Sequence, residues 1–260
     1  MIFLNLQFKG LVDIQEIRII LIKEMKNRLA DKERSLIRAW IWQSVLFLGL
    51  VTPIFFLIAG DWTWSWGWVL MILLWALMIS HPVLLIKRNP ELLAERAKGM
   101  DAEGTKAWDK PLVRVASIAW FSTWILGAMD RRLNWTGWIQ GGIHLGGAIG
   151  TGLGFALFIW AMVSNVFFAE GVRIQKERGH KVCDSGPYQF VRHPGYAGNI
   201  LAILSIPLLL GSFWSVIPAL LCSFFFILRT IKEDLTLKEE LEGYDQYANQ
   251  VQYLLLPGIW

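Results

Sequence analysis

Residues 66–86 read WGWVLMILLWALMISHPVLLI, a run without a single charged side chain. A helix needs about 20 apolar residues to cross the hydrocarbon core of a bilayer, and residues 40–59 form a second run of that length. Of the 260 residues, 55% are hydrophobic and only 18% are charged, so the chain is more apolar than a typical soluble domain. These runs predict helices that span a membrane.

Four further apolar segments follow along the chain, and each is a candidate membrane helix: 112–129, 139–167, 196–210 and 213–228. The last two are joined only by Gly211 and Ser212, which predicts an antiparallel helical hairpin. We therefore expect an all-α integral membrane protein with about six transmembrane helices and a C-terminal helical hairpin.

Basic residues predict the orientation of these helices. All but three of the 25 Lys and Arg residues lie before residue 40, within 87–110, within 168–194 or after 228. Because cytoplasmic loops are enriched in Lys and Arg, both termini and the segment before the hairpin are expected in the cytoplasm. This points to an integral membrane protein, and to a bacterial inner membrane as its location.

Other classes of site are not favoured by the composition. The net charge of +4, without a long basic run, does not indicate nucleic-acid binding. The two cysteines, Cys183 and Cys222, have neither metal-ligand spacing nor a disulfide pattern, so no metal is expected.

The polar stretch GPYQFVRHPGYAG, residues 186–198, stands immediately before the hairpin. An arginine and a histidine between apolar segments are costly to keep against a bilayer, so Arg192 and His193 indicate a polar site at the membrane edge. A turn with a snorkelling arginine is the simpler alternative. Gly186 and Gly198 would let the backbone approach a ligand closely.

The chemistry of this stretch and of the following tail suits a nucleoside-bearing, cationic cofactor. Glu233 could accept hydrogen bonds from both hydroxyls of a ribose. The rings of Tyr188 and Tyr196 could attract a positively charged sulfur. Arg192 or Arg229 could hold a carboxylate or phosphate through two hydrogen bonds.

Residues 192–198, RHPGYAG, resemble the RHPxYxG signature of the isoprenylcysteine carboxyl methyltransferase family. The second element of that family is an arginine, a pair of acids, and spaced leucine and tyrosine residues before a proline. This chain supplies its members in that order: Arg229, Glu233, Asp234, Leu237, Tyr244, Tyr247 and Pro257. The resemblance covers about residues 140–260. One departure is that the second acid is Asp234, which is one methylene shorter than glutamate.

The resemblance implies a membrane enzyme that uses S-adenosylmethionine in a cytoplasmic pocket. It assigns cofactor binding to His180, Pro187, Tyr188, Arg192, His193, Pro194, Tyr196, Gly198 and Glu233. It assigns the acceptor side and catalysis to Arg229, Glu233 and Asp234. The methyl acceptor would be lipophilic or small, and a carboxylate, an amine and a thiol are all compatible. An amine or thiol must lose a proton, which His193 or Asp234 could accept.

Three parts of the chain follow from this interpretation: a cytoplasmic or interfacial segment over residues 1–38, variable transmembrane helices over 39–138, and a methyltransferase core over 139–260. Within the core, a glycine stripe recurs every four residues, at Gly142, Gly146, Gly150 and Gly154. Such a stripe favours close packing of a second helix, although it could also make room for a ligand.

Two other functions remain open from the residues alone. One is a membrane reductase of the steroid-reductase type that uses a nicotinamide cofactor, although the chain has no Gly-x-Gly-x-x-Gly turn between a strand and a helix. The other is a transporter or scaffold, which polar residues in the middle of the bilayer would favour. Here the polar residues gather at one edge instead.

Overall fold

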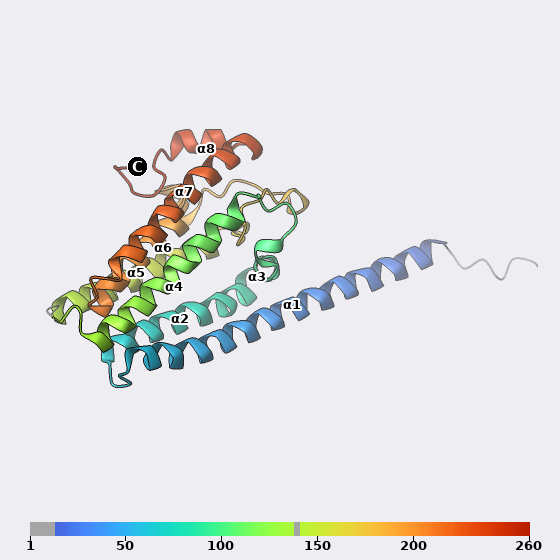
Figure 1. Ribbon diagram of the computed structural model, residues 1–260. Helices are drawn as coiled ribbons and strands as arrows, with labels where there is room; N and C mark the ends of the chain where they lie inside the picture. The colour runs from blue at the N-terminus through green and yellow to red at the C-terminus, as the bar shows by residue number, and fades with distance from the viewer. Residues whose placement is uncertain (1–13, 138–140) are drawn as a thin grey trace, which may run out of the picture.

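The computed structural model describes residues 14–137 and 141–260, and within these ranges every regular element is helical (Figure 1). The start of the predicted helix 139–167 and residues 1–13 lie outside the described residues. The α-helices are α1 (Ile14–Ala59), α2 (Ser65–Arg88), α3 (Pro90–Ala97), α4 (Asp109–Leu133), α5 (Gly141–Ser164), α6 (Pro194–Leu210), α7 (Val216–Glu240) and α8 (Tyr244–Gln250). Three short 3₁₀ turns join them: η1 (Gly99–Asp101), η2 (Lys176–Arg178) and η3 (Gly186–Gln189).

Four helices are long and apolar enough to cross a membrane, namely Ile37–Ala59 of α1, then α2, α4 and α5. The sequence-based expectation of an all-α membrane protein is confirmed at this level. The apolar helix α6 has only 17 residues, and α7 continues from its apolar half into a charged segment. The expected total of six crossings therefore stays a prediction.

Glycines allow α5 and α6 to pack with their backbones almost in contact. A Cβ on Gly154 would lie 2.5 Å from the backbone nitrogen of Ala202, and one on Gly198 would lie 2.6 Å from the carbonyl oxygen of Gly154. The packing interpretation therefore holds for Gly150 and Gly154, but Gly142 and Gly146 face open space and Gly147 takes their place in the interface. Helix packing thus explains Gly198, whose backbone is covered by α5.

The hairpin of α6 and α7 turns at Gly211, whose φ of +68° places it in the left-handed region. Its amide caps α6 by donating to the carbonyl of Leu208. The Ser212 hydroxyl donates to the buried carboxylate of Asp130 near the end of α4, at 2.6 Å. These contacts bring the turn of the hairpin to the same end of the bundle as the end of α4.

The opposite end of the bundle carries α3, α8 and the C-terminus (Figure 1). The N-terminal half of α1 projects past this end as one continuous helix, without a break at the boundary expected near residue 38. The segment between α5 and α6, residues 165–193, also lies here and forms the wall of the candidate site.

Candidate functional site

The Arg-His-Pro stretch is held in place by the C-terminal tail. Pro194 occupies the first turn of α6, where its missing N–H costs nothing. The amides of Arg192 and His193 donate to the carbonyls of Tyr253 and Leu254, at 2.9 and 3.0 Å. The Arg192 guanidinium also donates to the carbonyl of Val251, at 3.1 Å. The backbone of the motif is therefore held in place by contacts within the protein.

Asp234 joins this motif to α7. Its carboxylate lies 2.9 Å from Nε of Arg192 and 3.3 Å from Nε2 of His193, and it accepts a hydrogen bond from the Tyr244 hydroxyl at 2.9 Å. Burial opposes ionisation of the carboxyl, but hydrogen bonds from His193 and Lys238 hold the pKa of Asp234 well below its usual range. Asp234 is therefore a buried anion that organises its neighbours.

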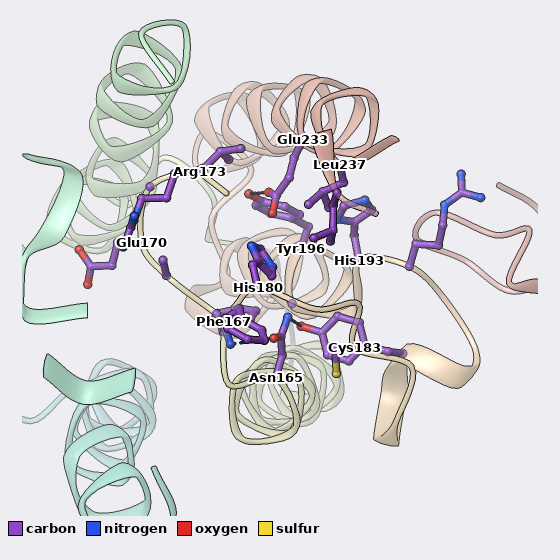
Figure 2. Close-up of a pocket in the computed structure, with 18 of the residues that line it drawn as sticks. Asn165, Phe167, Glu170, Arg173, His180, Cys183, His193, Tyr196, Glu233 and Leu237 are labelled. Atoms are coloured by element: carbon purple, nitrogen blue, oxygen red, sulfur yellow. Dashed lines mark hydrogen bonds between the residues drawn. The ribbon is translucent and has the colours of Figure 1, made fainter. Parts of the chain in front are cut away.

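Glu233, the other acid, has a different partner. It accepts a hydrogen bond from the Tyr196 hydroxyl at 2.5 Å. Figure 2 shows this pair facing the interior of the site. Arg229 lies one turn earlier on α7, with its guanidinium carbon 5.4 Å from the centre of the Tyr196 ring. The four-residue spacing of Arg229 and Glu233 places them on one helix face, and both line the same cavity.

Arg229 forms an ion pair with Asp109 at the start of α4. Nε and Nη2 of Arg229 donate to the two oxygens of this carboxylate, at 2.6 and 2.8 Å, and Nη2 also donates to the carbonyl of Glu170. The guanidinium thus already holds a carboxylate through two hydrogen bonds, and that carboxylate is part of the protein.

The segment after α5 builds the other wall. The ring of Phe167 lies 4.4 Å from that of His180, and Asn165 donates to the Tyr188 hydroxyl at 3.4 Å. Figure 2 shows Asn165, Phe167 and His180 across the site from Tyr196 and Glu233. Nδ1 of His180 accepts from the amide of Gln175, so the proton of the neutral ring belongs on Nε2. Burial, together with the charges of nearby arginines, lowers the pKa of His180 to about 4.

Between these walls lies a cavity of about 290 Å³, near the lower end of volumes typical of small-molecule sites. Seven of the residues predicted for the site line it: His180, Tyr188, Arg192, His193, Tyr196, Arg229 and Glu233. The other four do not line it: Pro187, Pro194, Gly198 and Asp234. The structure therefore brings most of the predicted set together around one space.

Several residues at this end of the bundle are missed by sequence reasoning. Arg96 of α3 donates to the carbonyl of Phe168 and pairs with Glu170 at 3.4 Å, and Arg173 forms a buried ion pair with Glu95. Their sequence signal is weak, because the loop 87–110 stands out only through its positive charge. Asp109 has a better signal, since it is an acid placed directly before an apolar helix.

Among the described residues, no group of three His, Cys, Asp or Glu side chains is placed to bind a metal ion. The site therefore offers aromatic rings, a carboxylate and hydrogen-bond donors as its binding groups. The apolar helices indicate an integral membrane protein. The binding groups surround a small-molecule cavity at one end of its helical bundle.

Comparison with known families identifies the class more closely. Residues 151–239 match the model of the isoprenylcysteine carboxyl methyltransferase (ICMT) family. The match runs from the middle of α5 to the end of α7, and it confirms the family indicated by the motif. The matched segment, like the motif, indicates a family of membrane methyltransferases, and the match does not favour the reductase alternative. A comparison with curated proteins gave no match to the chain.

Proposed function

We propose that the protein transfers a methyl group from S-adenosylmethionine to a lipophilic acceptor at the cytoplasmic face of a bacterial inner membrane. One observation carries the proposal: a single cavity is lined both by the Arg-His-Pro stretch and by Arg229 and Glu233 of α7. These are the two elements that the family shares. Their meeting around one space supports a common ligand.

The residues around the cavity fit the chemistry of this cofactor. Glu233 accepts one hydrogen bond from Tyr196 in the described part of the chain, which leaves its second oxygen for a ribose. The ring pair of Phe167 and His180 offers a face for the adenine base. The tyrosine rings of Tyr188 and Tyr196 suit a positively charged sulfur. These are the residues that would hold the cofactor.

The bound cofactor supplies a methyl group on a cationic sulfur, and the protein supplies position and a dry environment. Tyr188, Tyr244 and Tyr247 are buried beside the cavity and limit the access of water. Such exclusion favours a reaction in which charge is lost, and alignment of the two reactants lowers the barrier further. A carboxylate acceptor would need no general base.

An amine or thiol acceptor would have to lose a proton. His193 is better placed than Asp234 to take it, because His193 lines the cavity and Asp234 does not. Nε2 of His193 faces Asp234, so the free ring nitrogen, Nδ1, would hold the proton. Asp234 would then stabilise the positive imidazolium ring.

The acceptor end of the cavity supports a lipophilic substrate. Val113 of α4, Phe158 of α5 and Met100 of η1 contribute apolar side chains to the lining. Val113 and Phe158 belong to helices that are candidate membrane spans, so we propose that this end of the cavity receives its acceptor from the bilayer. A lipid-borne carboxylate, amine or thiol could enter from that side.

The proposal is tested by two measurements on the purified full chain in detergent. Isothermal titration calorimetry with S-adenosylhomocysteine should detect binding. Tritium from methyl-labelled S-adenosylmethionine should appear in the organic extract of host membranes, where the labelled product identifies the acceptor. Absence of both, together with oxidation of a reduced nicotinamide by the same protein, would reject the methyltransferase in favour of a reductase.

A further inference from the structure

One buried acid from the N-terminal half of the chain contacts a residue of the proposed site directly. Asp109 is fully buried at the first residue of α4. Its carboxylate accepts two hydrogen bonds from Arg229 and a third from the amide of Val172, at 2.8 Å. Asp109 lies outside the segment that matches the ICMT family, so the family does not account for it.

The neighbouring contacts fix the carboxylate itself. The amide of Lys106 donates to the carbonyl of Val172 at 2.9 Å, and a Cβ on Gly171 would collide with Thr105. The start of α4 thus packs tightly against residues 171–172, which belong to one wall of the cavity. Arg229 therefore meets a rigid partner, and its own position is fixed by it.

The positive charge of Arg229 matters because the cofactor proposed for the cavity is itself positively charged. The guanidinium belongs to a side chain that is only 12% exposed, packs against the ring of Tyr196 and lines the cavity. In a buried site, a bare positive charge would repel a sulfonium ion strongly, because little water screens the interaction. Asp109 contacts Arg229 directly and cancels this charge.

We infer that Asp109 is a positioning residue that orients Arg229 and neutralises it, so that the cavity accepts a cationic methyl donor. The inference rests on the proposed function. It predicts a signature that a purely structural ion pair would not give: Asp109 should affect the binding of the cationic donor more than that of its neutral product.

The test compares S-adenosylmethionine, whose sulfur is cationic, with S-adenosylhomocysteine, whose sulfur is neutral. Both are titrated calorimetrically into the native chain, Asp109→Asn, Arg229→Gln and the double variant Asp109→Asn/Arg229→Gln. In Asp109→Asn the affinity for the cationic donor should fall by about tenfold more than that for the neutral product. The double variant, which buries no unpaired charge at this site, should recover the native ratio of the two affinities.

The matched control is Asp101→Asn. Asp101 is an acid of η1, shortly before α4, but it is exposed and pairs with Lys110. This change should leave both affinities unaltered. Equal losses for the two ligands in Asp109→Asn, or a double variant that does not recover the ratio, would overturn the inference.

These titrations distinguish the role of Asp109 from the proposed binding of S-adenosylmethionine. A native chain that binds neither ligand contradicts the cofactor assignment as well. A native chain that binds both, with no charge-dependent loss in Asp109→Asn, overturns the role of Asp109 alone. If Asp109→Asn fails to fold, Arg229→Gln still decides. It leaves the Asp109 carboxylate without its partner, so the affinity for the cationic donor relative to the neutral product should rise above the native ratio, and the double variant should return to that ratio. An unchanged ratio in Arg229→Gln would overturn the inference.

Discussion

Glu233 is the side chain on which the cofactor assignment depends most directly. The substitution Glu233→Gln keeps the shape and an acceptor for the Tyr196 hydroxyl, but it removes the charge that would bind two ribose hydroxyls. Hydrogen bonds to a charged group contribute about 1.5–3 kcal/mol, so the affinity for S-adenosylhomocysteine should fall by about 10- to 100-fold. Calorimetric titration of the purified variant measures this loss.

Glu239 provides the control on the same helix, because it is exposed and lies six residues further along α7. Glu239→Gln should bind S-adenosylhomocysteine as the native chain does. Equal affinities for all three proteins would mean that Glu233 has no part in the cofactor site.

The ring of His180 gives the site a dependence on pH. Its pKa is lowered to about 4, mainly by burial and then by the charges of Arg173 and Arg178. Because this value lies below that of an exposed histidine, about 6.5, the neutral ring stabilises the wall of the cavity above that pH. This contribution to the free energy of unfolding is lost as the pH falls from about 6.5 towards 4, so thermal stability should decline over this window.

The variant His180→Gln separates this effect from other titrations, because a glutamine oxygen can still accept from the Gln175 amide but does not titrate. Thermal unfolding in detergent should be measured for both proteins between neutral and mildly acidic pH. A variant whose decline matches that of the native chain would show that another group causes it.

The sequence alone predicts the site residues that lie close to one another along the chain. Arg192, His193 and Tyr196 lie within five residues of one another, and their spacing alone indicates a site. Asp109 is 120 residues from Arg229 along the chain, and only the packing of α4 against α7 brings the two together. Nothing in the sequence near either residue specifies that contact.

At the scale of elements, the contact between α5 and α6 sets the position of the motif, because α6 begins at Pro194. Gly154→Ala should force these helices apart, since the added Cβ would lie 2.5 Å from backbone atoms of α6. Overpacking of this kind costs about 1–3 kcal/mol. Thermal unfolding in detergent, followed by circular dichroism, should show the loss.

Gly146→Ala is the matched control, because Gly146 lies on the same helix and a Cβ there meets nothing within 4 Å. Its stability should equal or exceed that of the native chain, since alanine favours a helix over glycine. The period of four alone could not distinguish these two glycines. The face that a helix turns towards its neighbour depends on the neighbour, and here the interface includes Gly147 instead of Gly146.

At the scale of the whole molecule, the number of membrane crossings follows from where the hairpin turns. The long apolar helix α4 leads to Asp130 and Thr136. The hairpin turn meets the same place, because Ser212 donates to Asp130 and the amide of Phe213 donates to the Thr136 hydroxyl. Although α6 is short, it therefore extends to the end of the bundle that α4 reaches.

Six crossings with both termini in the cytoplasm should follow from this arrangement. Fusions of alkaline phosphatase, which is active only outside the cytoplasm, should be active after Asp61, Trp135 and Ser212. They should be inactive after Lys106, Gln175 and the C-terminus, where a fluorescent protein should instead mature. An active phosphatase at the C-terminus, or an inactive one after Ser212, would mean that α6 and α7 do not cross as a hairpin. The cavity would then not face the compartment in which the methyl donor is made.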